Sequence, residues 1–101
     1  MNISGKKVDD KIMVTLEGRL DVNGSYIAEQ HFLKYALSGN VFVLDFEKVE
    51  LISSAGIRAL LSLYRTVSDN GGSVTILKPQ EMVYEVLKET NFLELFNIER
   101  L

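Results

Sequence analysis

Residues 41–46 read Val41-Phe42-Val43-Leu44-Asp45-Phe46, and this stretch decides the fold. It is a short, nearly continuous apolar run, rich in β-branched and aromatic side chains. Such a run is typical of a central strand covered on both faces, whereas a strand with one wet face alternates apolar and polar residues. We therefore expect this strand to lie in the middle of a sheet, with the other strands and helices drawn from the sequence on either side.

The chain before this strand predicts a hairpin and a helix. Residues 11–17 alternate apolar and polar side chains, as a half-buried strand does, and residues 3–8 fit as its hairpin partner across a turn at Asp9-Asp10. After this hairpin the apolar residues change to helical spacing. Asn23 or Ser25 has the side chain to cap that helix.

The chain after residue 46 predicts alternating helices and strands. Residues 55–70 have one apolar and one polar stripe at helical spacing, and Gly71-Gly72 ends that helix. The remaining elements are a strand at 73–77, a helix starting near Pro79, a short helix at 91–96 and an edge strand at 97–101. This order predicts an α/β fold with a single domain over residues 1–101. Its mixed β-sheet has right-handed crossovers and helices packed mainly on one face.

Composition limits the function. The chain of 101 residues, 47% hydrophobic and 25% charged, is ordinary for one soluble domain. With no cysteine and one histidine it lacks the side chains for a thiolate nucleophile or for most zinc sites, and we expect no cofactor and no metal. A formal net charge of −3 disfavours direct nucleic-acid binding. The absence of a long apolar segment and of a signal peptide predicts no membrane insertion and a cytoplasmic location.

The most unusual local feature is the block Ser53-Ser54-Ala55-Gly56, between the loop that follows the central strand and the two-faced helix. Its small residues predict that Ser54 lies at or near the helix N-cap, where its oxygen can accept a hydrogen bond from the first turn. A plain capping serine would explain this spacing. Three functional interpretations compete with it: a nucleophilic serine, an anion site at the helix N-terminus, and a serine that is itself phosphorylated.

The first two functional interpretations lack supporting residues. A hydrolase elbow would have glycine where Ile52 stands, and the one histidine, His31, precedes the serine, so a small serine hydrolase is a remote alternative. No glycine-rich nucleotide-binding motif precedes the helix. Phosphorylation needs no further side chain in this protein and would add roughly 1.5 to 2 negative charges.

Several blocks of the chain resemble the STAS domain of bacterial anti-sigma factor antagonists. They are Gly18-Arg19-Leu20-Asp21, Val43-Leu44-Asp45-Phe46, the segment from Val49 to Leu61, Gly71-Gly72, and Phe92-Leu93-Glu94-Leu95-Phe96. They follow the family's order over nearly the whole chain. The Ser-Ser-x-Gly block is the most specific of them.

The resemblance implies a binding module with no catalysis of its own. Family members bind an anti-sigma factor, often also a serine kinase, and so release a sigma factor. The kinase phosphorylates the serine at the start of the second main helix, and a serine phosphatase reverses the modification. Matched residue by residue, that serine is Ser54 and the turn aspartate near the partner surface is Asp21. With these two, Ser53, Gly56 and Arg58 make up the expected partner-binding set, Arg58 because it lies one helical turn beyond Ser54.

In one respect the sequence departs from the family pattern Asp-Ser-(Ser/Thr/Ala)-Gly. Ser53 stands at the aspartate position, so two hydroxyls are adjacent and Ser53 is a second candidate for phosphorylation. STAS domains also serve as scaffolds in transport ATPase and stress-sensing complexes. A scaffold role of that kind is the alternative to a phosphorylation switch.

Overall fold

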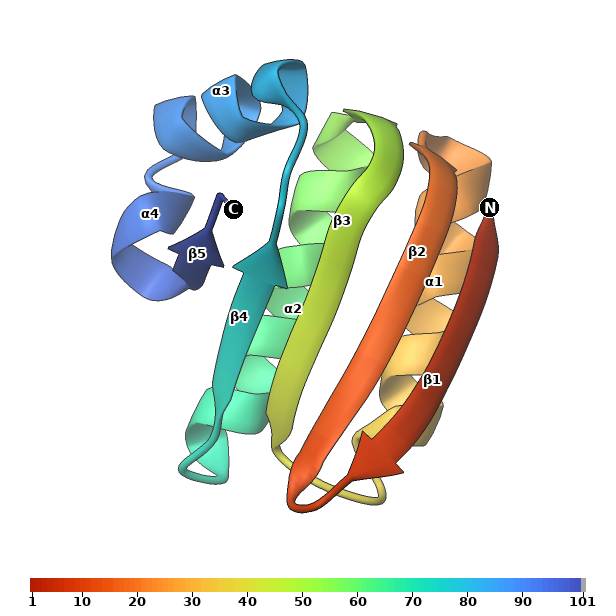
Figure 1. Ribbon diagram of the computed structural model, residues 1–101, viewed down its shortest axis with the longest axis vertical. Coiled ribbons are helices and arrows are strands. Elements are labelled where there is room, and N and C mark those ends of the chain that lie inside the picture. The colour runs from red at the N-terminus through yellow and green to blue at the C-terminus, as the bar shows by residue number, and fades with distance from the viewer. Residues whose placement is uncertain (101) are drawn as a thin grey trace.

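The computed structural model describes residues 1–100 of the chain. Its elements are β1 (Asn2–Val8), β2 (Lys11–Leu20), α1 (Val22–Tyr35), β3 (Val41–Ile52), α2 (Ser54–Asp69), β4 (Ser73–Leu77), α3 (Glu81–Glu89), α4 (Phe92–Leu95) and β5 (Asn97–Glu99) (Figure 1). The order of strands and helices is the predicted one. Leu101, the last residue of the predicted edge strand, lies outside the described residues.

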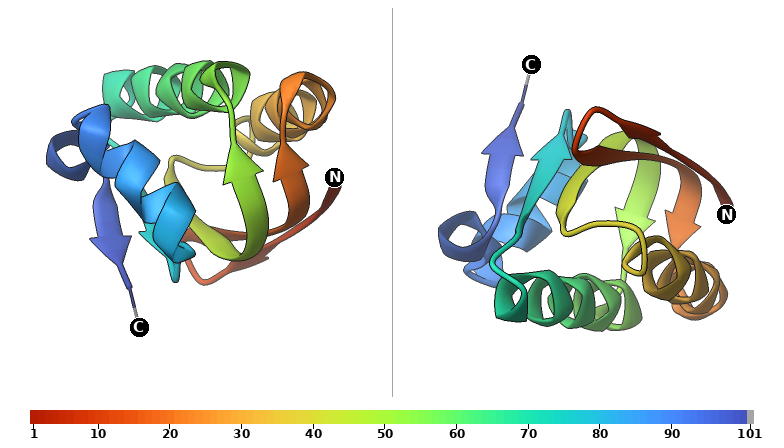
Figure 2. Two further views of the ribbon diagram at one scale, coloured as in Figure 1. Left: turned by 90° about the horizontal axis from the view of Figure 1, so that it is seen from above. Right: turned by 90° about the horizontal axis from the view of Figure 1, so that it is seen from below.

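The five strands form one mixed sheet in the order β1-β2-β3-β4-β5. The β1–β2 hairpin is antiparallel, and every other neighbouring pair is parallel. Helices α1 and α2 lie side by side over one face of this sheet, as the two end-on views in Figure 2 show. The predicted α/β architecture, with helices mainly on one face, is confirmed.

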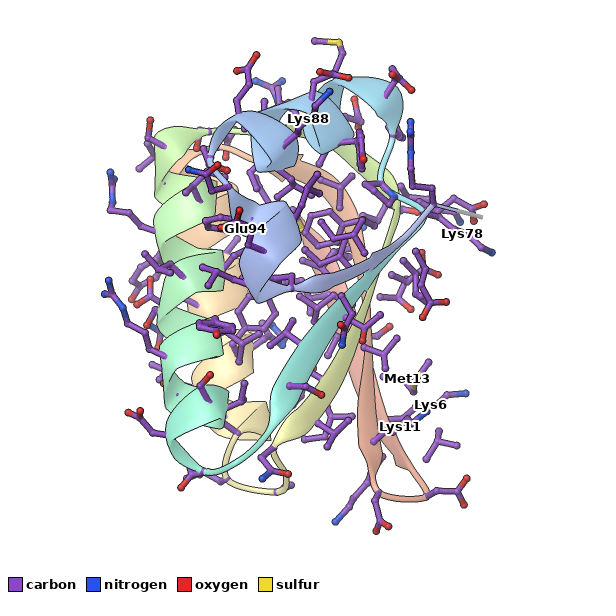
Figure 3. The ribbon with its side chains drawn as sticks, turned by 90° about the vertical axis from the view of Figure 1, so that its left-hand side faces the viewer. Lys6, Lys11, Met13, Lys78, Lys88 and Glu94 are labelled. Atoms are coloured by element: carbon purple, nitrogen blue, oxygen red, sulfur yellow. The ribbon has the colours of Figure 1, made fainter. Side chains whose placement is uncertain are left out.

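The prediction that β3 is covered on both faces is wrong. Its side chains alternate, with Phe42, Leu44 and Phe46 buried and Val41 and Val43 only half-buried on the opposite side. The run reads as continuously apolar because valines occupy this open face. Figure 3 shows that same face from the side, where the labelled Lys6, Lys11 and Met13 project away from the helices.

Strand β3 is also longer than expected. A loop was expected after Phe46, but the strand continues through Glu47, Lys48 and Glu50 to Ile52. It remains paired with β2 through two register shifts, and these bulges accommodate the charged residues at the surface. The sheet therefore runs directly up to α2, with a single residue between them.

The predicted turns are confirmed. Val8 pairs with Lys11, and Asp9 between them takes the left-handed conformation with φ 56°. Gly71, which follows α2, has φ +75°, a conformation that glycine adopts without strain. Helix α1 ends at Tyr35, earlier than Gly39 suggested, because a tight turn carries the chain toward β3.

Candidate functional site

The ends of β2 and β3 bring two helix N-termini together. Leu20 and Ile52 are the last residues of these strands and are partners in the sheet register. The next residues, Asp21 and Ser53, are the N-caps of α1 and α2. Both helices therefore start at the same edge of the sheet, the upper edge in Figure 1, with their positive dipole ends side by side.

Ser53 is the N-cap of α2 and is tied to both neighbouring elements. Its Oγ accepts a hydrogen bond from the Gly56 N–H at 3.3 Å and donates one to the Leu20 carbonyl at 2.8 Å. Its backbone N–H donates to the same carbonyl at 2.9 Å. The prediction that Ser54 caps the helix is therefore wrong by one residue. The N-cap is Ser53, whose extended backbone directs its hydroxyl toward the first turn.

Ser54 is the first residue of α2 and its side chain is exposed. Within residues 1–100 its hydroxyl takes part in no hydrogen bond. The first turn of α2 carries no acidic side chain, because the cap is a neutral serine where the family pattern has aspartate. A solvent-accessible hydroxyl thus stands at a helix N-terminus whose own first turn carries no carboxylate.

Gly56 lies inside the molecule, so it does not form the partner-facing surface that we expected. A Cβ at this position would lie 2.7 Å from Cγ1 of Ile52 and 3.0 Å from both Cβ and the carbonyl oxygen of Leu20. Glycine at this position lets the first turn of α2 rest directly on the ends of β2 and β3. Its contribution to the site is therefore to place Ser54.

Asp21 is both a structural cap and a surface residue. Its Oδ1 accepts a hydrogen bond from the Gly24 N–H at 2.8 Å, while Oδ2 lies 3.8 Å from Nε of the exposed Arg19. The predicted caps, Asn23 and Ser25, are wrong: both lie inside the helix. Ser25 is buried and its Oγ has no hydrogen-bond partner among the described residues.

Arg58 follows Ser54 by one turn on the exposed side of α2. Within the described part of the chain its guanidinium forms no ion pair. It is therefore available to a phosphate on Ser54 or to a carboxylate on a partner. Arg65, also exposed, lies two turns further along the same helix.

Two apolar side chains beside Asp21 were not singled out from the sequence. Val22 and Tyr26, at the start of α1, are both largely exposed. Helical spacing would have revealed them, because neither lies on the face of α1 that buries Ala28 and Phe32. The site thus combines hydroxyl, charged and apolar groups, the usual mixture at a protein-binding surface.

The structure does not place the histidine of the chain near Ser54, as a catalytic serine would require. His31 is the tenth residue of α1, so it lies about 14 Å along the helix from the N-terminal edge where Ser54 stands. Its Nδ1 is 3.1 Å from the Tyr35 hydroxyl. Across residues 1–100, no group of three potential ligands from histidine, aspartate and glutamate gathers at a metal-binding distance. No helix in that range is long and apolar enough to cross a membrane.

Comparison with known proteins identifies the family to which this fold belongs. The family model of the STAS domain matches residues 2–100. A crystal structure of a candidate anti-sigma factor antagonist from Thermotoga maritima superimposes with a TM-score of 0.89 at 24% identity, covering 96% of this chain and 85% of the other.

Two further structures share the fold at lower identity. The phosphorylated form of SpoIIAA, a Bacillus cell fate determinant, gives a TM-score of 0.77 at 15% identity and covers 96% of this chain and 90% of its own. A sulfate transporter family protein from Wolinella succinogenes gives 0.80 at 14% identity, with 92% and 79% covered. The same fold therefore occurs in proteins with different roles.

Proposed function

The chain belongs to the STAS domain family, and on that premise we propose that it is an anti-sigma factor antagonist whose binding is switched by phosphorylation of Ser54. The observation that carries the proposal is the exposed, unpaired hydroxyl of Ser54 at the start of α2, beside the N-terminus of α1. The antagonist descriptions of its structural neighbours support this role.

The proposed partner is an anti-sigma factor that is also a serine kinase. In its unphosphorylated form the protein binds this partner through the surface around Asp21, Ser53, Ser54 and Arg58, and the sigma factor is released. Phosphorylation at Ser54 blocks that binding, and a serine phosphatase restores it. Since sigma factors act on transcription, the proposed site of action is the bacterial cytoplasm. The protein itself is a regulator and not an enzyme.

The two adjacent serines make the acceptor testable. Ser53 uses its hydroxyl as both donor and acceptor inside the structure, whereas the Ser54 hydroxyl is free. We expect Ser54→Ala to abolish phosphorylation by the partner kinase and to leave binding insensitive to ATP. Ser53→Ala should still be phosphorylated but should lose about 1 kcal/mol of stability with its cap.

The experiment starts with affinity capture from the source cell, with and without ATP. The captured kinase is then incubated with each variant, and the added phosphate is located by mass spectrometry. Incorporation into Ser54→Ala but not into Ser53→Ala would move the acceptor to Ser53. A capture that yields no ATP-dependent partner at all would reject the switch.

Arg58 provides a second test of the surface. Because it stands one turn from Ser54, Arg58→Ala should weaken binding of the anti-sigma factor by about tenfold, the effect of losing one charge-assisted contact. Arg65→Ala, a loss of the same charge on the same helix, is the matched control and should change the affinity by less than about twofold. Equal losses measured by calorimetric titration would make Arg58 an ordinary surface charge.

Asp21→Asn separates the two roles of this residue. The amide oxygen of asparagine can still accept the Gly24 N–H, so the cap of α1 survives and the melting temperature should change little. Removal of the negative charge should lower partner affinity if Asp21 faces the partner. Thermal melting and partner titration of this variant measure the two effects independently. A lower melting temperature with unchanged affinity would leave Asp21 only its capping role.

A scaffold role in a transport complex is the second candidate. The observation that favours it is the shared fold of the Wolinella sulfate transporter family protein. A scaffold would bind its complex equally well with and without ATP, so the capture experiment distinguishes the two roles. Recovery of a transport ATPase, with no phosphate on Ser54, would support the scaffold.

A further inference from the structure

The hydroxyl of Ser53 joins two elements that are far apart in the sequence. Its oxygen donates a hydrogen bond to the carbonyl of Leu20, the last residue of β2, at 2.8 Å. The same oxygen accepts a hydrogen bond from the N–H of Gly56, in the first turn of α2, at 3.3 Å. A serine hydroxyl has one proton to donate and lone pairs with which to accept, so both bonds can exist at once. We call this pair of hydrogen bonds the Ser53 bridge.

The Ser53 bridge holds the backbone on both sides of Ser54. On one side, the backbone N–H of Ser53 also donates to the Leu20 carbonyl, at 2.9 Å. On the other side, Gly56 packs against the end of β3, since a Cβ on it would lie 2.7 Å from Cγ1 of Ile52. The exposed Ser54 therefore stands between two residues that are anchored to the sheet.

The bridge also ties Ser54 to the start of α1. Asp21 directly follows Leu20, and its side chain caps α1 by accepting the Gly24 N–H. The carbonyl that receives the bridge thus belongs to the residue that leads into this cap. Loss of the Ser53 hydroxyl would leave the backbone N–H of Ser53 as its one hydrogen bond to this carbonyl. The hydroxyl therefore helps to fix where Ser54 stands relative to the neighbouring helix.

From this geometry we infer that Ser53 is a positioning residue for phosphoryl transfer to Ser54, an inference that rests on the proposed function. In that reaction the Ser54 Oγ forms a bond to the γ-phosphorus of ATP, and the bond from this phosphorus to the oxygen of the departing ADP breaks. The hydroxyl proton passes to a base of the kinase. Misplacement of a reacting atom by about 1 Å can slow such a step on the order of a hundredfold. The Ser53 hydroxyl acts on this step through the backbone, because its proton is donated inside the protein.

Single-turnover phosphorylation by the captured kinase tests the positioning role. Ser53→Ala removes the bridge and should slow phosphoryl transfer at saturating kinase about tenfold, while affinity for the kinase changes by less than about threefold. Ser53→Thr keeps a hydroxyl that can donate and accept, so its transfer rate should return to within about twofold of the unaltered chain. A loss of affinity with an unchanged transfer rate would make Ser53 a direct contact of the kinase and would overturn the inference.

Asn40→Ala is the matched control for a general loss of stability. The Asn40 Nδ2 donates to the carbonyl of Asn70 at 2.7 Å, a hydrogen bond between residues 30 positions apart at the opposite end of α2. Its removal should lower the melting temperature, as Ser53→Ala does, but should leave the transfer rate unchanged. Equal slowing in the two variants would show that the rate follows overall stability, which contradicts a positioning role.

NMR relaxation of the Ser54 amide tests the bridge without the kinase. Its order parameter should be about 0.85 in the unaltered chain and in Ser53→Thr, and should fall toward about 0.6 in Ser53→Ala. An order parameter that Ser53→Ala leaves unchanged would overturn the inference. In the kinase assay, absence of phosphate on the unaltered chain would reject the proposed function and this role with it. Equal transfer rates for the unaltered chain and Ser53→Ala would reject the positioning role alone.

Discussion

Protein phosphorylated at Ser54 is expected to bind its anti-sigma factor on the order of a hundredfold more weakly than the unmodified protein, and to be no less stable. The two effects have different causes. In the complex, a partner surface that fits a neutral hydroxyl must desolvate about two negative charges, which costs several kcal/mol when nothing compensates them.

In the free protein the same phosphate is well placed. It joins the first residue of α2, where backbone N–H groups and the positive end of the helix dipole favour an anion by about 0.3 to 1 kcal/mol. No acidic side chain in the first turn opposes it. The modification therefore changes binding without loosening the helix.

The measurement compares phosphorylated and unmodified protein by thermal melting, and by partner titration at low and high salt. High salt screens the general repulsion between acidic surfaces but not the local desolvation at Ser54. A large fall in melting temperature would indicate that the switch works by local unfolding. Full recovery of binding at high salt would assign the effect to net charge.

Gly24→Ala is expected to destabilise the fold by about 3 kcal/mol, although the same substitution in an ordinary helix stabilises by about 1 kcal/mol. The reason is the close approach of α1 to the end of β2. A Cβ on Gly24 would lie 1.9 Å from the carbonyl oxygen of Arg19 and 3.1 Å from its carbonyl carbon, and both of these are backbone atoms. Neither can move without pulling the helix from the sheet.

Urea unfolding of Gly24→Ala and of Asn23→Ala tests this expectation. Asn23 is the preceding residue and is exposed, so its change to alanine should alter stability by less than about 0.5 kcal/mol. A gain in stability for Gly24→Ala would show that the first turn of α1 is free to move away from β2. Intermediate behaviour, with a loss below about 1 kcal/mol, would indicate partial relaxation of the strand end.

Hydrophobic spacing predicted the order of the elements, because β2, β3, β4 and the longer helices each bury one regular face. It failed where the local preference of a residue competes with pairing between strands that are distant in the sequence. A loop was expected after Phe46, yet pairing with β2, including that of Glu17 with Lys48, continues the strand to Ile52. The helix caps were predicted at the wrong residues for a similar reason. Asp21 and Ser53 are the caps because they directly follow the ends of β2 and β3, and the spacing of residues along a single helix does not show where those strands end.

The candidate site was partly visible in the sequence. The small residues and the family resemblance singled out Ser54, which proves to be the exposed serine of the pair. The hydrogen bond that the Ser53 hydroxyl donates could not be predicted from the sequence, because its acceptor, the carbonyl of Leu20, lies 33 residues earlier in the chain. The exposed apolar residues Val22 and Tyr26 could have been found from their helical spacing, because they lie off the face that buries Ala28 and Phe32.

The single-residue connection between β3 and α2 has a consequence for the kinetics of recognition. Ser54 lies one residue beyond the end of β3, where Ile52 is paired with Leu20 of β2 and Ser53 is hydrogen-bonded to the Leu20 carbonyl, so this surface loses little conformational entropy when a partner docks. Association then needs no slow ordering step and proceeds at the roughly 10⁵ to 10⁷ M⁻¹s⁻¹ usual for preformed surfaces. Modification of Ser54 should therefore act mainly by shortening the lifetime of the complex.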